Sequence, residues 1–257
     1  MQTKFTTSTN IIRDSAREIN YIPTPNANRV VNQITNDFKK GIRSFNIIGS
    51  YGTGKSSFLW ALQQSLQGKK RFFNFNLLQA PKVEVINFIG EFKSITNEFA
   101  DYFDVSQSKN QSQNILSEIF NRYHSLGKKN PLLILVIDEF GKFLEYASQN
   151  LPEKELYFIQ QLSEFANNPD HNIILLTTVH QNFDTYAFAL SNAQKQEWTK
   201  VKGRFREITF NEPVEQLLFL ASEYVSENFE AKASKSAVEK CLKLAALTKA
   251  FTFNKDF

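Results

Sequence analysis

The sequence predicts an α/β fold in which a mostly parallel five-stranded sheet is flanked by helices and followed by a short C-terminal helical lid. Three observations support this prediction. A glycine-rich turn at residues 49–54 separates a short apolar stretch from an amphipathic one. An uninterrupted apolar run at residues 132–137 ends in two carboxylates and suits a central strand covered on both faces. The chain has 257 residues and is 42% hydrophobic, which is enough to bury one sizeable core.

We expect three parts along the chain. Residues 1–20 are polar and rich in Thr, Ser and Asn, so we predict a loosely ordered N-terminus. Residues 21–212 hold the core, and residues 213–257 hold a partial helical lid that begins after a proline-containing break.

The composition favours a soluble cytoplasmic protein. The single cysteine, Cys241, excludes an intramolecular disulfide and fits a reducing compartment, and we favour its interpretation as a small apolar residue on a helix face. Residues 1–10 lack the apolar segment of a signal peptide, and the run at residues 132–137 is too short to cross a bilayer. We therefore expect no membrane partner. The net charge of +4 permits a nucleic-acid partner without arguing for one.

The glycine-rich turn matches a phosphate-binding loop, because Gly49, Gly54, Lys55 and Ser56 satisfy the pattern G-x-x-x-x-G-K-[ST] of the Walker A motif. A loop around a polyphosphate must direct several backbone N–H groups inward, and glycine permits the required backbone angles. The positive end of the following helix then faces the phosphates. Lys55 can reach the β and γ oxygens, and the Ser56 hydroxyl can bind Mg²⁺. The residues predicted to bind the nucleotide are Gly49, Ser50, Tyr51, Gly52, Thr53, Gly54, Lys55, Ser56 and Ser57.

The carboxylates after the apolar run, Asp138 and Glu139, follow the Walker B pattern. Ligands of parallel α/β sheets gather at the carboxyl ends of the strands. Asp138 can hold Mg²⁺ directly or through water, and Glu139 can orient and polarise an attacking water. An Asp-Glu pair after a strand can also be a helix N-cap and a solvated acid. Its combination with the upstream loop favours the catalytic interpretation.

The segments before residue 132 are assigned from their periodicity. Residues 83–86 fit a strand or a helix equally well. The first elements are a helix that stops at Gly41, with Val30, Val31, Ile34 and Phe38 on one face, and then a strand at 44–48. After the loop we expect a helix with Phe58, Leu59, Leu62 and Leu66 inward and a second strand at 71–77. A segment with helical spacing of Phe88, Phe92, Ile95, Phe99 and Phe103 follows, and then a helix around 115–123.

After the apolar run we expect further alternation of helix and strand. The predicted elements are an amphipathic helix at 153–167, a fourth strand at 172–178, a helix and a polar stretch around Trp198 within 182–203, a fifth strand into which residues 200–210 lead, and lid helices at 217–225 and 237–250.

Polar side chains follow the fourth strand, where Thr178 or His180 could sense a γ-phosphate or hold the lytic water. We favour Thr178, since a histidine more often satisfies a local hydrogen bond. His124 and His171 lie in no cluster with metal-ligand spacing, so we predict no zinc site.

Two further segments leave alternatives open. Tyr21, Ile22 and Pro23 precede the first helix and either contact a nucleotide base or simply pack. Four basic residues before the fifth strand could form a solvated rim, a nucleic-acid patch or an arginine supplied to a neighbour's phosphate; they are Lys200, Lys202, Arg204 and Arg206.

With these motifs placed, the chain resembles the AAA+ ATPases, most of all the initiator or origin-recognition side of that superfamily, and is similar to ATPases of bacterial defence operons. The resemblance covers roughly residues 20–257, and only its two Walker motifs are specific. It implies a P-loop NTPase core with strand order 5-1-4-3-2 and a lid that starts near Pro213. It also implies that Thr178 is sensor I and that Arg204 is the finger that reaches an adjacent subunit's nucleotide.

The lid departs from that pattern. An AAA+ lid usually has three or four helices and a sensor II arginine on the third, whereas this sequence ends at Phe257 after about two predicted helices. Either the chain is a fragment of a longer protein or its lid is shortened.

The leading hypothesis is an ATPase that uses ATP and Mg²⁺, held by Ser56 and Asp138, with Glu139, Lys55, Thr178 and Arg204 as catalytic residues. Hydrolysis would drive a conformational change or an assembly, in a homo- or hetero-oligomer formed through Arg204. The partner, protein or DNA, stays open.

Three other functional classes are compatible with parts of this pattern. A nucleotide-dependent switch or assembly module with negligible turnover is the main alternative. A P-loop small-molecule kinase shares the loop, but the core holds no segment that resembles an arginine-bearing lid. A GTPase would carry N-K-x-D, and the Asn-Lys-Asp at residues 254–256 has the wrong spacing.

Overall fold

The computed structural model describes residues 8–74, 82–127 and 129–213, together with residues 216, 218 and 221. The chain divides into two units, Met1–Glu212 and Pro213–Phe257. All the helices and strands named below belong to the first unit. The lid helices predicted at residues 217–225 and 237–250 lie outside the described residues, apart from residues 218 and 221.

Five parallel strands form one sheet in the order β2-β3-β4-β1-β5, which confirms the predicted order. The strands are β1 Ser44–Ile48, β2 Val83–Ile89, β3 Leu132–Asp138, β4 Ile173–Val179 and β5 Arg206–Thr209. Ile47 lies opposite Thr178 on one side and Ile208 on the other. The carboxyl ends of the three central strands, β1, β3 and β4, therefore lie side by side at the same end of the sheet.

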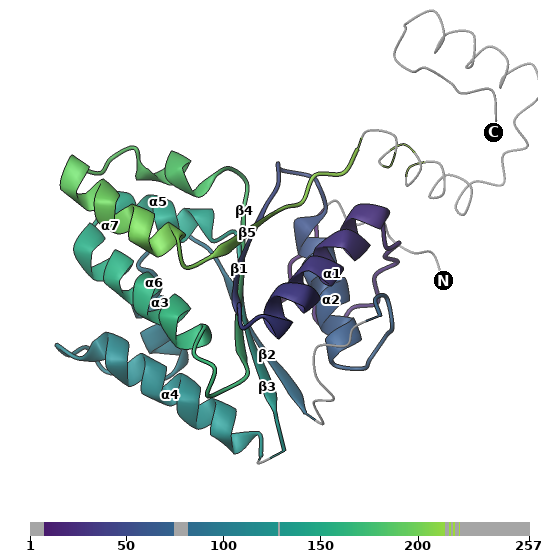
Figure 1. Ribbon diagram of the computed structural model, residues 1–257, viewed down its shortest axis with the longest axis horizontal. Helices are drawn as coiled ribbons and strands as arrows, with labels where there is room; N and C mark the ends of the chain where they lie inside the picture. The colour runs from purple at the N-terminus through teal and green to yellow at the C-terminus, as the bar shows by residue number, and fades with distance from the viewer. Residues whose placement is uncertain are drawn as a thin grey trace, which may run out of the picture. The chain divides into compact units, whose positions relative to one another are not determined.

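Helices cover both faces of the sheet (Figure 1). On one face lie α1 Pro25–Lys39 and α2 Lys55–Leu66. On the other lie α3 Ile95–Tyr102, α4 Gln111–Ser125, α5 Gly141–Gln149, α6 Pro152–Ala166, the 3₁₀ turn η1 Phe183–Ala187 and α7 Asn192–Lys202.

The central strand β3 shows why this arrangement is stable. All seven of its residues are buried. Successive side chains of a strand point to opposite faces, so Leu135 and Ile137 join the cluster under α3–α7 while Ile134 and Val136 join the cluster under α1 and α2. Each such burial contributes about 1.5–3 kcal/mol, which explains the uninterrupted apolar run in the sequence.

The predicted second strand at residues 71–77 is wrong. Residues 71–74 are not in a strand, and residues 75–77 lie outside the described residues. The second strand is β2, which pairs with β3 along its whole length, from Val83 opposite Leu132 to Ile89 opposite Asp138. The aromatic residues before it serve packing instead: Phe72 and Phe73 contact the ring of Tyr21 edge-on.

Two other local assignments also change. Phe88 and Phe92 precede the helix that their spacing suggested, since Phe88 lies in β2 and α3 starts at Ile95 after the N-cap Ser94. The polar stretch around Trp198 is helical: α7 starts with a capping box between Ser191 and Gln194, and it buries Trp198. In addition, α5 has no counterpart in the sequence-based assignment.

Within the described part of the chain, no helix combines the length and the apolar character that a membrane crossing requires.

His171, just before β4, is a buried titratable group. Its side chain is only 3% exposed, and its ring packs against Phe165 at a centroid distance of 4.6 Å and against Tyr123 at 5.9 Å. Among the described residues, neither ring nitrogen has a side-chain or backbone hydrogen-bond partner. Burial, with a smaller effect from the charge of Arg43, lowers the pKa of His171 below its ordinary value of 6.5.

This environment predicts a stability loss on acidification. Because the folded pKa of His171 lies below the unfolded value of 6.5, the unfolded state binds more protons, and the contribution of neutral His171 is lost as the pH falls below 6.5. Urea unfolding between pH 8 and pH 5.5 should show a falling free energy of unfolding, with a shallower slope in His171→Leu. The exposed His124 supplies the control, His124→Leu. Identical slopes in all three proteins would contradict the assignment.

Candidate functional site

A cavity of about 340 Å³ lies at the carboxyl ends of β1, β3 and β4. It brings together residues from both sequence motifs, and its lining consists of Ser8, Thr9, Tyr51, Gly52, Gly54, Lys55, Ser56, Ser57, Asp138, Glu139, Lys142, Thr178, Val179 and His180. A wider and shallower hollow of about 640 Å³ lies along α1 and Arg206. We regard the smaller cavity as the functional site, because the hollow on α1 contains no residue of either motif.

The loop between β1 and α2 has the backbone that its glycines predict. Gly52 and Gly54 have φ of 77° and 85°, in the left-handed region that L side chains disfavour. Gly49 meets a different constraint, since a Cβ there would lie 2.2 Å from the carbonyl oxygen of Phe210. Phe210 in turn donates its N–H to Ile48 at 2.6 Å, so β5 and the loop are in close contact. Lys55, the first residue of α2, lines the cavity. The N-terminus of α2 thus lies at the cavity, and the first N–H groups of a helix have no intrahelical partners.

The Lys55 ammonium lies inside the curve of the loop. It donates to the carbonyl oxygens of Gly49 and Ser50, the latter at 2.8 Å. Burial lowers the pKa of Lys55, while the negative charges of Asp138 and Glu139 act in the opposite direction. The lysine predicted to contact β and γ oxygens thus faces the two acids across the cavity.

Asp138 is tied to the neighbouring strand. Its carboxylate is buried, and Oδ1 accepts hydrogen bonds from the Thr178 hydroxyl at 2.5 Å and from the Glu139 N–H at 3.1 Å. The Thr178 oxygen also accepts from the Glu139 N–H at 3.0 Å. Since a hydroxyl has one proton, the proton of Thr178 is committed to Asp138.

Glu139 has a strained backbone and an exposed side chain that lines the cavity. Its φ of 54° is left-handed, a conformation that costs a non-glycine residue about 1–3 kcal/mol. The neighbouring strands hold it there: Phe140 donates its N–H to the Thr178 carbonyl at 2.8 Å, and Gly90 after β2 approaches so closely that a Cβ would lie 2.0 Å from the Glu139 carbonyl oxygen.

The residues predicted to hold Mg²⁺ are compatible with it. The Ser56 hydroxyl and the Asp138 carboxylate line the same cavity, and oxygen ligands of this kind suit Mg²⁺. Both hydrogen bonds of the Asp138 carboxylate fall on Oδ1, which leaves Oδ2 for a cation. In the described residues, no group of three or more His, Cys, Asp or Glu side chains could hold a metal. Mg²⁺ here would take its other ligands from phosphates and water, as it usually does.

His180 lies at the mouth of the cavity, held by two aromatic side chains. Its ring stacks on Tyr51 of the loop, with centroids 4.4 Å apart and planes 23° apart. Its Nδ1 lies 3.0 Å from the Tyr186 hydroxyl. Lys142 also lines the cavity and escaped sequence reasoning, because it lies on the unassigned helix α5.

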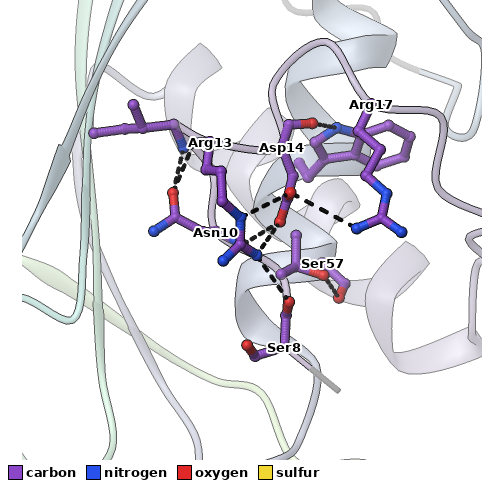
Figure 2. A network of polar contacts seen from close by, with 9 residues as sticks. Ser8, Asn10, Arg13, Asp14, Arg17 and Ser57 are labelled. Atoms are coloured by element: carbon purple, nitrogen blue, oxygen red, sulfur yellow. Dashed lines mark hydrogen bonds and ion pairs between the residues drawn. The ribbon is translucent and has the colours of Figure 1, made fainter. Parts of the chain in front are cut away.

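An N-terminal arm, residues 8–17, packs beside α2 (Figure 2). Ile11 is fully buried, and the carbonyl of Asp14 accepts the indole N–H of Trp60 at 3.1 Å. The Asp14 carboxylate accepts two hydrogen bonds from Arg13, at 3.0 and 2.7 Å. These bonds, with a backbone N–H from Asn10, lower the pKa of Asp14 to about 2.

The arm reaches the cavity through Ser8 and Thr9. The Thr9 and Ser57 hydroxyl oxygens lie 2.8 Å apart. Sequence reasoning missed both lining residues, because a polar N-terminal segment carries no motif that relates it to the loop.

Some predicted residues lie elsewhere. Tyr21, Ile22 and Pro23 do not line the cavity. Arg204 precedes β5 and so lies at the amino ends of the strands, whereas the loop lies at their carboxyl ends. Its side chain binds Glu164 of α6.

The four basic residues at and before the start of β5 are each paired with a carboxylate of the chain. The pairs are Lys200 with Glu197, Lys202 with Asp184, Arg204 with Glu164, and Arg206 with Asp37. The pairs of Lys200, Lys202 and Arg204 lie at the surface and contribute little to stability, whereas Asp37, the partner of Arg206, is buried. All four pairs neutralise the local charge. This segment is therefore a charge-paired surface, which weakens the case for a nucleic-acid patch.

No family model and no curated protein matches the sequence. Solved structures do match. The Aeropyrum pernix ORC2 protein in ADPNP–ADP complexes has a TM-score of 0.52 and 16% identity, over 83% of this chain and 56% of that chain. Drosophila ORC bound to DNA has a TM-score of 0.50 and 12% identity, over 90% of this chain and 55% of that chain. The chain thus spans little more than half the length of these proteins. At these identities the likeness shows the fold alone: the described core has the α/β fold of these two proteins.

The contact between Gly90 and Glu139 gives a stability prediction. Gly90→Ala would place a methyl group against the Glu139 carbonyl and should lower the free energy of unfolding by about 1–3 kcal/mol, as measured by urea denaturation. Gly203→Ala is the matched control, since its Cβ would meet nothing closer than the Thr199 carbonyl at 3.4 Å; its change should stay within about 0.5 kcal/mol. Equal stability of the two variants would show that the Glu139 backbone is free to move.

Proposed function

We propose that this chain binds Mg-ATP in the cavity beside Lys55 and hydrolyses it, and that hydrolysis drives a conformational change or an assembly. The observation that carries the proposal is the convergence of Lys55, Ser56, Asp138 and Glu139 on one cavity at the carboxyl edge of the sheet. A phosphate-binding lysine, two candidate Mg²⁺ ligands and an acid near the water-attack position are the parts that phosphoryl transfer to water requires.

Each residue has a distinct task in this proposal. The N–H groups of the loop and of the α2 N-terminus surround the phosphates, and Lys55 neutralises charge on the β and γ oxygens. Ser56 and Asp138 would hold Mg²⁺, which supplies charge stabilisation at the phosphates. Glu139 orients a water and accepts its proton. Thr178 acts through Asp138, since its hydroxyl proton is bound there.

Water is the acceptor that best fits the site. A kinase requires a pocket for a second substrate, whereas the lining opposite the loop consists of the two acids, Lys142 and the end of β4. A switch with negligible turnover would share every binding residue and differ only in the use of Glu139.

Arg204 is proposed to act on a neighbouring subunit. Its position at the amino edge of the sheet keeps it away from the cavity of its own chain. Its partner Glu164 is about half exposed, so the ion pair is accessible and can be exchanged for a phosphate at low cost.

Two substitutions test the nucleotide site. Lys55→Ala should abolish ATP binding in titration calorimetry, because the loop loses its only described side-chain cation. Glu139→Gln should bind ATP normally and release phosphate at less than about a hundredth of the wild-type rate, because the amide cannot accept a proton. The controls are the exposed residues of α6, as Lys154→Ala and Glu153→Gln. Wild-type turnover in Glu139→Gln would refute the mechanism, and ATP binding without turnover in the wild type would favour the switch.

A mixing experiment tests Arg204. Arg204→Ala and Glu139→Gln should each be inactive alone, but a mixture should recover turnover, because a site with intact Glu139 can then meet a neighbour with intact Arg204. The control replaces Glu139→Gln with the double variant that also carries Arg204→Ala, and this mixture should stay inactive. Full activity of Arg204→Ala alone would exclude the proposed role.

A further inference from the structure

Lys142, at the start of α5, is a cation of the cavity that the proposed mechanism does not use. Its side chain lines the cavity, and its N–H donates to the Glu139 carbonyl at 3.0 Å. The two residues that follow it, Phe143 and Leu144, are fully buried. The backbone of Lys142 is therefore fixed next to the acid proposed to activate water, and its side chain borders the same cavity.

The start of a helix is an unfavourable place for a lysine. The unpaired N–H groups of the first turn give this end of the helix a partial positive charge, which repels a cation. The first turn of α5 contains no acidic residue that would compensate the charge of Lys142. The position of this lysine thus conflicts with the stability of its helix, and such conflicts are expected at functional sites.

Glu145, the acid that pairs with Lys142 in the described part of the chain, does not hold its ammonium tightly. The Nζ atom of Lys142 lies 3.7 Å from Oε2 of Glu145, which is beyond hydrogen-bond distance. The two side chains are 41% and 26% exposed, and pairs of this kind contribute little to stability. An ammonium group has three N–H donors, so Lys142 has donors to offer to an anion in the cavity.

The charge of Lys142 acts at the mouth of the cavity from one wall, and the charge of Lys55 acts there from the other. Their common effect is seen at His180, which lines the mouth. Burial is the largest cause that lowers the pKa of His180; the charge of Glu145 opposes it, and the charges of the two lysines add to it. Two ammonium groups thus act on the space between the loop and α5, where the proposed function places the terminal phosphate.

We propose that Lys142 is a catalytic residue that binds the terminal phosphate of ATP on the side away from Lys55 and stabilises the charge on its oxygens during hydrolysis. The proposal rests on the proposed function, because it adds one residue to the same reaction. Its observation is a weakly paired ammonium on the wall of the cavity that carries Glu139. Lys142 acts within its own chain, whereas Arg204 is proposed to act on a neighbouring one.

In this step the oxygen of a water forms a bond to the terminal phosphorus. The bond from that phosphorus to the bridging oxygen of the β-phosphate breaks, and its electron pair leaves with ADP. Glu139 accepts a proton of the water, while Lys142 keeps its own three protons and donates hydrogen bonds to the oxygens of the transferred group, over which the charge is spread. ADP has no terminal phosphate, so this contact stabilises bound ATP and the transition state but not bound ADP.

Lys142→Met tests the assignment, because methionine keeps much of the apolar stem and removes the charge. Its kcat for phosphate release should fall at least about tenfold, since a hydrogen bond to a charged group corresponds to roughly a tenfold to hundredfold change. Its affinity for ADP in titration calorimetry should stay within about twofold of the wild type. Lys142→Arg, which keeps the charge and the donors, should retain most of the rate. The matched control is Lys154→Met, an exposed lysine in the first turn of α6 that does not line the cavity.

A stability measurement separates this role from a structural one. Lys142→Met removes a cation from the start of α5, so the midpoint of its urea unfolding should stay at the wild-type value or rise, although its kcat falls. A midpoint that falls together with kcat would show that Lys142 supports the helix, and the assignment would be overturned.

The outcomes also separate this proposal from the proposed function. If Lys55→Ala loses ATP binding but Lys142→Met keeps the wild-type kcat, or loses affinity for ATP and ADP by the same factor, the assignment of Lys142 is overturned while the nucleotide site stands. If the wild type binds no ATP, both proposals fail. If the wild type binds ATP without turnover, Lys142→Met should weaken binding of the non-hydrolysable β,γ-imido analogue at least about tenfold relative to ADP. An unchanged ratio of the two affinities would overturn the assignment.

A mixing experiment shows in which chain Lys142 acts. Lys142→Met and Glu139→Gln each impair the site of their own chain, so their mixture should release phosphate no faster than the sum of the two separate rates. A rate above that sum would show that Lys142 acts on a neighbour's site, which would overturn its assignment to the site of its own chain.

Discussion

The hydrogen bonds that join the end of β3 to the end of β4 are the constraint on which the site depends. Thr178 binds the Asp138 carboxylate and the Glu139 N–H with one hydroxyl, and its carbonyl accepts the N–H of Phe140. These contacts hold one acid buried and turn the next residue into the left-handed region, so that its carboxylate is exposed at the cavity. Asp138 and Glu139 thereby acquire different environments. The buried carboxylate of Asp138 suits a metal ion, and the exposed carboxylate of Glu139 suits the acceptance of a proton.

The same edge of the sheet is stiffened by close backbone contacts that exclude side chains. Gly49 lies against the carbonyl of Phe210, Gly90 against Glu139, and Gly141 against the Tyr186 phenol. Each glycine allows two elements to approach more closely than a Cβ would permit, so the loop, the acids and the imidazole are held at short range by β5, β2 and η1. A phosphate that bound here would contact groups fixed by three separate parts of the core.

Sequence reasoning identified the elements whose signals are local. The loop and the paired carboxylates were found because backbone geometry and metal chemistry require those residue types at those spacings. β3 was found because burial on both faces demands an uninterrupted apolar run. The second strand was misplaced, since the aromatic segment at 71–77 and the segment at 83–89 have similar β propensity, and only pairing with β3 decides between them. Helix α5, which directly follows the acids, was not assigned from the sequence.

By itself, therefore, the sequence determined the α/β class, the strand order through its resemblance to AAA+ proteins, and part of the cavity lining, although Gly49, Ser50 and Thr53 of the predicted loop do not line the cavity. The tertiary structure decided which neighbours reach them: the arm with Ser8 and Thr9, Lys142 on α5, and His180 beside Tyr186. It also engaged Thr178 with Asp138 and moved Arg204 to the far edge of the sheet. The physical reason is that motifs report chemistry between residues close in the chain, whereas hydrogen-bond partners and charge neighbours come from segments that only packing brings together.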